Sequence, residues 1–168
     1  MTDLARIRQL AANVDTTAIC DADKDTRVVS PALRCRSAHP ALCGPALTVR
    51  CREDFFGVVQ AIEEATPGQV LVVDGGGRRT ALAGELLTRA AMTRGLAGII
   101  VDGGYRDMSY VATSTLPVYS RYVTPMAGTT NRPGVLNQPV GCGGVLVSPG
   151  DIVIADVEAA TSSSPTWR

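Results

Sequence analysis

Two patterns of apolar residues alternate along this chain, and together they predict a sheet flanked by helices. Val70–Val73 and Gly98–Val101 are continuous apolar runs, which are typical of strands buried on both faces. Between these runs, apolar residues recur at helical spacing from about Gly84 to Arg94 and predict a helix there. A strand, a helix and a second strand in this order indicate an α/β fold with a parallel or mixed sheet.

The same patterns extend the prediction over most of the chain. Further helices are expected over Leu4–Ala11 and Phe55–Ala65, and further strands over Ala46–Cys51 and Pro117–Tyr119. Gly144–Val147 and Ile152–Ala155 flank the turn Ser148–Asp151, so we expect them to form a closing β-hairpin. No stretch is rich enough in Gly, Ser or Pro to divide the chain. We expect one domain over residues 1–156, followed by a loose tail over 157–168.

Composition and charge narrow the classes of function. The 168 residues are 45% hydrophobic and 19% charged, which is an ordinary balance for one globular domain. The 16 basic and 16 acidic residues give a net charge of zero, so the electrostatic footprint of a general nucleic-acid binder is missing. No apolar run is long enough to span a bilayer, and the N-terminus does not resemble a signal peptide. We therefore expect a cytoplasmic protein with no nucleic-acid or membrane partner.

The inventory of reactive side chains excludes several mechanisms. His39 is the single histidine, which excludes a multi-histidine metal centre and an HExxH zinc site. Lys24 is the single lysine and lies in the acidic segment Asp21–Asp25, whose carboxylates keep it protonated and unsuited to an imine mechanism. The five cysteines have no CxxC spacing, so zinc ribbons and redox dithiols are not expected.

Candidate chemistry concentrates between Asp74 and Asp107. Asp74 and Asp102 each close a predicted strand and are followed by glycines. In open α/β sheets, ligands bind at the C-terminal ends of the strands. The triplet Gly75–Gly77 fits neither GxGxxG nor a P-loop, so it indicates a turn rather than a nucleotide site.

Two short segments could bind an anion and a metal. Gly84–Leu87 begins the predicted helix, where unpaired N–H groups and the helix dipole favour a small carboxylate. The alternative is a plain glycine N-cap, with Glu85 complementing the dipole. Arg106 offers a planar fork for a carboxylate, and Asp107 offers a hard oxygen ligand for Mg²⁺ or Mn²⁺. The alternative for this pair is a surface ion pair after a strand.

The joint spacing of these two segments is specific. Glu85 in Gly-Glu-Leu-Leu is followed, after 20 residues, by Arg106-Asp107 in Val-Asp-Gly-Gly-Tyr-Arg-Asp. With these motifs the chain resembles the family of regulator of ribonuclease activity A, which includes metal-dependent 4-hydroxy-4-methyl-2-oxoglutarate aldolases and carries an acid-x20-Arg-Asp signature. The further matching motifs are Gly44–Val49, Pro67–Asp74, Arg94–Gly98, Pro139–Val145 and Ser148–Asp151. The resemblance covers about Asp15 to Asp156.

The resemblance implies an α/β/α sandwich of the swivelling-domain kind, assembled as trimers or pairs of trimers with pockets at subunit boundaries. It also implies a lyase that uses Mg²⁺ or Mn²⁺ to cleave small 4-hydroxy-2-oxo acids to pyruvate and that decarboxylates oxaloacetate as a side activity. By this resemblance, the substrate's pyruvyl end is bound by Gly84, Glu85, Leu86, Leu87 and Arg106. Asp107 would ligate the metal, Glu85 would orient metal-bound water, and Asp102 would support the site.

The chain departs from the family pattern in three places. Cys20-Asp21-Ala22 replaces the usual Ser-Asp-Ala, and Arg52–Phe56 replaces a polar stretch at the expected pocket rim. After Asp156, a serine-rich segment stands where family members continue through a valine-rich strand into a last helix. Glu158 is the only carboxylate left there that could replace an acid supplied to the neighbouring subunit. A second class of function stays open, namely a non-catalytic regulator that docks on a ribonuclease or another protein.

Overall fold

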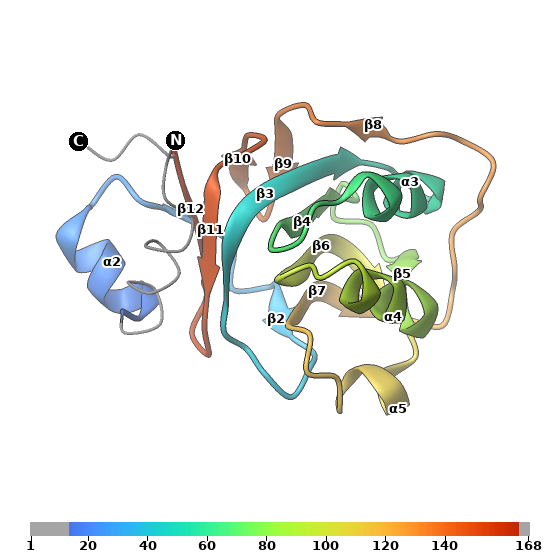
Figure 1. Cartoon of the computed structure of the whole chain (residues 1–168), viewed down its shortest axis with the longest axis horizontal. Helices are drawn as coiled ribbons and strands as arrows, with labels where there is room; N and C mark the ends of the chain where they lie inside the picture. The colour runs from blue at the N-terminus through green and yellow to red at the C-terminus, as the bar shows by residue number, and fades with distance from the viewer. Residues whose placement is uncertain (1–13, 165–168) are drawn as a thin grey trace.

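The computed structural model describes residues 14–164, and the helix predicted over Leu4–Ala11 lies outside them. Most of the described strands belong to one curled, mixed sheet (Figure 1). Its strand order is β1-β12-β11-β3-β4-β6-β7-β2, while β5 pairs with β6 and β8 pairs with β3. The α/β fold class predicted from the sequence is confirmed.

Four parallel strands form the centre of the sheet. They are β3 (Leu42–Arg50), β4 (Val70–Asp74), β6 (Gly98–Tyr105) and β7 (Val118–Val123). Every residue of β4 and β6 is buried, as their continuous apolar sequences predict. Because the strands are parallel, their C-terminal ends share one edge of the sheet, and Arg106-Asp107 follows β6 directly at that edge.

Antiparallel and short strands complete the sheet. Beside β3 lie β11 (Ile152–Ala155), β12 (Ala160–Ser163) and β1 (Arg27–Val28), in that order. Next to β7 lies β2 (Arg34–Cys35), while β5 (Ala81–Ala83) runs parallel to β6 and β8 (Val135–Leu136) runs antiparallel to β3. A separate hairpin pairs β9 (Val140–Cys142) with β10 (Val145–Val147).

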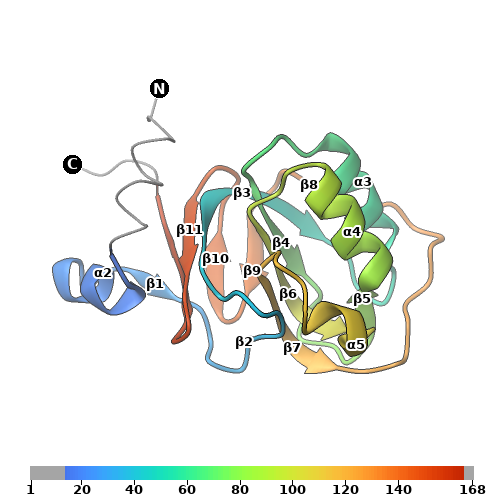
Figure 2. The ribbon, with the colours of Figure 1, turned by 60° about the horizontal axis from the view of Figure 1, so that its bottom comes forward.

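The two faces of the sheet are covered differently. Helices α3 (Phe56–Glu64), α4 (Glu85–Thr93) and α5 (Met108–Val111) lie on one face, and the β9–β10 hairpin lies on the other (Figure 2). Helix α2 (Thr16–Ala22) begins beside the β11–β12 turn, where the Thr16 N–H donates to Asp156 Oδ2 at 2.7 Å. None of the helices in the described part of the chain is long and apolar enough to cross a membrane.

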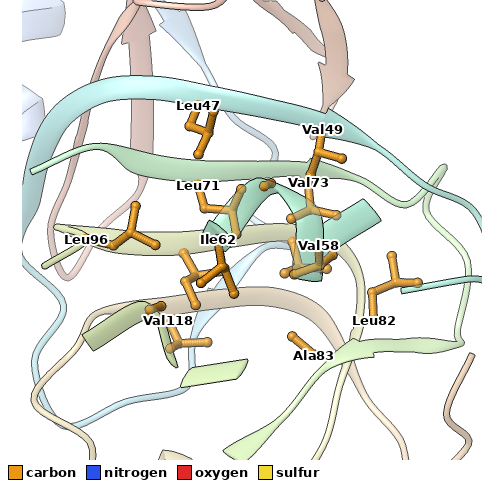
Figure 3. Packing of buried hydrophobic residues seen from close by; sticks show 14 of the residues in the cluster. Leu47, Val49, Val58, Ile62, Leu71, Val73, Leu82, Ala83, Leu96 and Val118 are labelled. Atoms are coloured by element: carbon orange, nitrogen blue, oxygen red, sulfur yellow. The ribbon is translucent and has the colours of Figure 1, made fainter. Parts of the chain in front are cut away.

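Successive strand residues divide between two apolar cores, because side chains alternate across a sheet. Leu71 and Val73 of β4 pack towards the helices with Val58 and Ile62 of α3 (Figure 3). The intervening residues of β4 belong to a second cluster, which also contains hairpin residues from β9 and β10. The helices and the hairpin therefore pack on the same strands from opposite sides.

The structure corrects two predictions for the C-terminal part. Gly144–Val147 and Ile152–Ala155 do not pair with each other, because β10 pairs with β9 while β11 pairs with β3 and β12. The tail predicted over 157–168 is not loose at residues 160–163, which form β12 with three buried residues between β1 and β11. Its polar sequence, Ala-Thr-Ser-Ser, gave no apolar signal for a strand. The Ser162 hydroxyl is instead accommodated by the Asp151 carboxylate, at 3.4 Å.

Candidate functional site

A pocket of about 250 Å³ opens where helix α4 begins. Its walls come from the start of α3, from β5 and the start of α4, and from the segment after β6. The lining residues are Phe55, Val59, Ala81, Leu82, Ala83, Gly84, Leu86, Leu87, Arg106, Asp107 and Ala127. Only Arg106 and Asp107 among them carry a charge. The structure therefore brings together five of the residues that the sequence singled out, namely Gly84, Leu86, Leu87, Arg106 and Asp107.

The start of α4 is open towards an anion. Gly84 is the N-cap residue and supplies no capping side chain. The Glu85 N–H donates to Asp107 Oδ2 at 3.0 Å, while the N–H groups of Leu86 and Leu87 have no acceptor within the helix. A Cβ at position 84 would collide with the Asp107 carboxylate and with Arg106 Cγ. Glycine is needed here for this close approach.

Arg106 and Asp107 are fixed by the backbone at the end of β6. The Arg106 N–H donates to the Ala83 carbonyl at 3.1 Å, which ties this segment to β5. Asp107 has left-handed backbone angles (φ 59°, ψ 47°) and is the N-cap residue of α5. Arg106 Nε lies 3.6 Å from Asp107 Oδ2, and both side chains are 40% exposed. A guanidinium and a carboxylate are thus presented together to the pocket.

A buried pair of hydroxyl groups, from Thr88 and Tyr105, connects the two segments that form this end of the pocket. The Thr88 hydroxyl donates to the Gly84 carbonyl at 2.8 Å and lies 2.7 Å from the Tyr105 hydroxyl. Burial raises the pKa of Tyr105 well above its usual range, so the phenol stays protonated. Tyr105 directly precedes Arg106, and the pair therefore links the end of β6 to the first turn of α4.

Glu85 lies at the start of α4, but its carboxylate is directed along the helix rather than into the pocket. Its Oε1 accepts from Arg89 Nε at 2.8 Å, one helical turn away. The Arg89 guanidinium also lies over the Tyr110 ring, 4.2 Å from its centroid. Arg89 therefore holds the Glu85 side chain, and Tyr110 holds Arg89 in turn.

Asp102 lies apart from this pocket. Its carboxylate accepts from Arg121 Nε at 2.5 Å and from the Gly143 N–H at 2.7 Å, and it is largely buried. Gly143 belongs to the β9–β10 turn, so Asp102 points to the hairpin face of the sheet and not to the helix face. The structure does not bring it together with Arg106 and Asp107. Its contacts attach the hairpin to the sheet.

Six residues that line the pocket belong to none of the motifs that predict the site, namely Phe55, Val59, Ala81, Leu82, Ala83 and Ala127. Phe55 and Val59 are apolar positions of the helix predicted over Phe55–Ala65, and a helical pattern cannot distinguish a core position from a pocket wall. Ala127 reaches the pocket because the segment after β7 runs beside β5, where the Gly128 N–H donates to the Ala81 carbonyl at 3.0 Å. No local motif marks that approach.

Asp54 organises the wall next to Phe55. Its Oδ2 accepts from the Thr129 hydroxyl at 2.6 Å and from the N–H groups of Asn131 and Arg132, at 2.7 and 3.1 Å. Its Oδ1 accepts from the Phe56 N–H at 2.9 Å. Burial alone would raise the pKa of Asp54, but these hydrogen bonds outweigh it and lower the pKa to about 2. Asp54 is therefore ionised at neutral pH and clamps the loop over 129–132 to α3.

A metal ion would find one protein carboxylate in the pocket. No group of three or more His, Cys, Asp or Glu residues in the described part of the chain is arranged to hold a metal by itself. Asp107 Oδ1 has no hydrogen-bond donor among the described residues, whereas Oδ2 accepts the Glu85 N–H. Mg²⁺ is commonly bound through one or two carboxylates and completed by water and substrate oxygens. The donor set fits a cation of that kind.

The chain is similar in sequence to proteins of a known family. Residues 16–160 match a family model described as RraA-like, Aldolase/RraA. The chain is 34% identical over 150 residues to a protein of Halalkalibacterium halodurans named "Putative 4-hydroxy-4-methyl-2-oxoglutarate aldolase". The match covers 88% of this chain and 71% of that relative.

Solved structures with the same fold carry other functional names. The RNA-processing inhibitor RraA from Thermus thermophilis has a TM-score of 0.86 at 29% identity, covering 92% of this chain and 95% of the other. An S-adenosylmethionine:2-dimethylmenaquinone methyltransferase from Geobacillus kaustophilus has a TM-score of 0.85 at 33% identity, covering 90% and 95%. Because one fold carries three differently named functions, the chemistry of the pocket has to distinguish between them.

Proposed function

This chain belongs to the RraA-like family, and from that membership and its pocket we propose that it is a divalent-metal-dependent aldolase. Its substrates would be 4-hydroxy-2-oxo acids such as 4-hydroxy-4-methyl-2-oxoglutarate, which it would cleave to pyruvate. The observation that carries the proposal is the meeting of Arg106, Asp107 and the open start of α4 at one end of the pocket. Oxaloacetate decarboxylation, which gives the same pyruvate enolate, would be a side activity.

The reaction defines what the residues must do. The 4-hydroxyl group loses its proton, its oxygen becomes a carbonyl, and the C3–C4 bond breaks. The electron pair of that bond passes to C3 and gives the enolate of pyruvate, which is then protonated at C3. Catalysis therefore needs donors that hold the carboxylate and stabilise negative charge as it develops on the 2-oxo oxygen.

Arg106 and the start of α4 are suited to both tasks. The guanidinium fork can bind a carboxylate through two parallel hydrogen bonds and cannot lose its charge near neutral pH. The N–H groups of Leu86 and Leu87 lie at the positive end of the helix dipole, which favours an anion. These groups would orient the pyruvyl end of the substrate with C1 towards Arg106.

Asp107 would hold the divalent cation, and Glu85 would order the solvent that carries the proton. When bound, the cation would act as a Lewis acid that polarises the 2-oxo group. The Asp107 carboxylate is kept in place by the Glu85 N–H and by its N-cap position on α5. The Glu85 side chain is kept in place by Arg89. Only the Asp107 carboxylate lines the pocket in this structure, so the Glu85 carboxylate would have to leave Arg89 to order solvent beside the cation.

We further assign the mouth of the pocket to a boundary between subunits in a trimer or a pair of trimers. Leu86 lines the pocket and is 76% exposed, and Met126 next to Ala127 is 70% exposed. Large apolar side chains of this kind at a pocket rim are typical of surfaces that another subunit covers. A partner at this position would close the pocket against water.

A regulator that docks on a ribonuclease is the second candidate, and the likeness to an RNA-processing inhibitor supports it. The two candidates make opposite demands on the pocket. A docking protein needs no paired guanidinium and carboxylate beside an open helix start, whereas an aldolase does. The retained pocket therefore favours the enzyme.

The proposal is tested by measuring pyruvate release from 4-hydroxy-4-methyl-2-oxoglutarate and from oxaloacetate, with and without a chelator. We expect release that stops with EDTA and returns with Mg²⁺ or Mn²⁺. Borohydride added with pyruvate should leave the protein unlabelled, because Lys24 is an exposed residue paired with Asp21 and is unsuited to an imine. A covalent adduct at Lys24 would contradict the metal mechanism, and no release from either compound would favour the regulator.

A further inference from the structure

We propose that Tyr105 and Thr88 are positioning residues of the site, and that a path of buried hydrogen bonds from them sets the direction of the Asp107 carboxylate. The inference rests on the proposed function, because this carboxylate is the one that would hold the cation. Tyr105 and Thr88 do not line the pocket themselves. They act through the peptide unit between Gly84 and Glu85.

The Asp107 carboxylate depends on one hydrogen bond for its direction. In the described part of the chain its single hydrogen-bond donor is the Glu85 N–H, at 3.0 Å from Oδ2. Arg106 Nε lies 3.6 Å from the same oxygen, which is too far for a hydrogen bond. Asp107 is the N-cap residue of α5, but its side chain accepts no hydrogen bond from that helix. The direction of the Glu85 N–H therefore decides which carboxylate oxygen remains free for a cation.

The Glu85 N–H belongs to the same peptide unit as the Gly84 carbonyl. This peptide bond is trans and planar, so its N–H and its C=O point in opposite directions and can only turn together. The Gly84 carbonyl accepts from the Thr88 N–H at 3.0 Å and from the Thr88 hydroxyl at 2.8 Å. The hydroxyl thus adds a second restraint to the ordinary helix hydrogen bond. By holding the carbonyl, Thr88 also fixes the direction of the Glu85 N–H.

The number of protons available fixes the direction of the next contact. The Thr88 and Tyr105 hydroxyls lie 2.7 Å apart, and this distance alone does not say which one donates. The single proton of the Thr88 hydroxyl goes to the Gly84 carbonyl, because a carbonyl oxygen can only accept. The Tyr105 hydroxyl therefore donates to Thr88 Oγ1. Each hydrogen bond in such a chain polarises and strengthens the next one.

The path is closed within one chain. Tyr105 is the last residue of β6, and Asp107 follows two positions later. The hydrogen bonds therefore leave the end of β6, pass through the first turn of α4 and return to the segment after β6. Tyr105 and Thr88 are both 0% exposed, so neither solvent nor another subunit reaches them. Their effect on Asp107 consequently does not depend on assembly.

Amide hydrogen exchange tests the path in the metal-free protein. Tyr105→Phe keeps the ring in the core and removes only the hydroxyl. We expect the Glu85 amide to exchange at least about threefold faster in this variant than in the parent, because its hydrogen bond is held less firmly. Tyr119→Phe is the matched control, since Tyr119 is 2% exposed and donates to the Pro40 carbonyl from the second apolar cluster. An unchanged rate in Tyr105→Phe, or an equal increase in Tyr119→Phe, would overturn the inference.

Variants of Thr88 and the affinity for Mn²⁺ connect the path to the site. Thr88→Val keeps the shape of the side chain and removes the hydroxyl, whereas Thr88→Ser keeps the hydroxyl. Titration calorimetry of the whole protein should give a Kd for Mn²⁺ at least about threefold higher in Thr88→Val and in Tyr105→Phe than in the parent. Thr88→Ser and the control Tyr119→Phe should bind Mn²⁺ as the parent does. Affinity that is equally weakened in Tyr119→Phe, or that is not retained in Thr88→Ser, would show a merely structural role and overturn the inference.

The two readouts separate this inference from the aldolase proposal. If Thr88→Val does not fold, Tyr105→Phe decides, because phenylalanine fits the same space. Faster exchange at Glu85 and weaker Mn²⁺ binding in the variants of a protein that releases no pyruvate would support the positioning role and contradict the aldolase. Pyruvate release by the parent, together with parental Mn²⁺ affinity in Tyr105→Phe, would overturn the inference and leave the aldolase intact. A parent protein that binds no Mn²⁺ would overturn the inference as well.

Discussion

Gly84 and Asp107 are fitted to each other at the scale of single atoms. The Asp107 carboxylate occupies the space in which a Cβ at position 84 would lie, and there it accepts the Glu85 N–H. Gly84 has extended backbone angles, so its role is to leave room and not to adopt a left-handed conformation. The glycine of the motif Gly-Glu-Leu-Leu is therefore required by the side chain of Asp107, which lies 23 positions later.

Gly84→Ala should impair the site while leaving the fold nearly intact. The new methyl group would displace the end of the Asp107 side chain, which can move, and the Glu85 hydrogen bond would be lost at a cost of about 1 kcal/mol. Calorimetry should show weaker Mn²⁺ binding, and kcat/KM for pyruvate release should fall. Gly141→Ala is the matched control, because a Cβ there meets nothing within 4 Å. Parent-like Mn²⁺ affinity in Gly84→Ala would show that Asp107 does not hold the cation.

Arg106→Lys should not be a conservative change. Lysine keeps the charge but loses the planar fork, and the loss of one donor to developing negative charge typically costs about 3–4 kcal/mol, or roughly 10²- to 10³-fold in rate. We expect such a decrease in kcat/KM with Mn²⁺ binding retained. Arg94→Lys, at the exposed far end of α4, should behave as the parent does. A decrease smaller than about threefold in Arg106→Lys would remove Arg106 from the mechanism.

At the scale of elements, Asp54 holds the pocket wall formed by α3, and its ionisation makes the stability of the fold depend on pH in acid. Its pKa in the folded protein is about 2, below the ordinary value of 3.8. A carboxyl group of this kind stabilises the fold at pH values above its ordinary pKa, and the contribution is lost as the pH falls through the folded pKa. The expected contribution is about 2 kcal/mol.

Urea unfolding from pH 7 to pH 2 measures this contribution. Asp54→Asn should lower the free energy of unfolding at pH 7 by about 2 kcal/mol, and the difference from the parent should shrink between about pH 4 and pH 2. Asp21→Asn is the control, because Asp21 and its partner Lys24 are both 75% exposed. A difference between Asp54→Asn and the parent that does not change with pH would contradict the assignment.

The elements with strong apolar patterns could be predicted, and the rest depended on contacts distant in sequence. The helix predicted from about Gly84 to Arg94 is observed over Glu85–Thr93, and the two buried strands are found as β4 and β6. Strand β5 has only three residues, and β12 is polar, so neither produces a recognisable period. Both exist because a neighbouring strand offers an edge to pair with.

The residues of the candidate site that lie in a local motif could be predicted, whereas those that reach it through contacts distant in sequence could not. Arg106 and Asp107 follow a strand end in a specific motif, so their position could be read from the sequence. Asp102 is only a few residues earlier, but its side chain leaves the other face of the sheet and pairs with Arg121. Phe55 and Ala127 join the pocket through pairing between loops, which no local pattern encodes.

At the scale of the whole molecule, the apolar rim of the pocket predicts an assembly. Light scattering at micromolar concentration should give a mass of three or six times the 17.5 kDa of one chain. Met126→Asp should shift the protein towards monomers, because it places a charge at the proposed boundary. Val157→Asp changes another exposed side chain, 82% exposed, and should leave the mass unchanged. A monomeric parent protein would contradict the assembly.

The central claim is that the pocket at the start of α4 is an active site that works through Asp107. Asp107→Asn tests it most directly, since asparagine tolerates the left-handed backbone (φ 59°) that alanine would strain, and the change removes only the charge. The measurement is kcat/KM for Mg²⁺-dependent pyruvate release by Asp107→Asn and by the parent. We predict a loss of at least about 10²-fold, with an unchanged midpoint of unfolding. Release at the parental rate by Asp107→Asn would contradict the claim and leave the docking function as the better account of this protein.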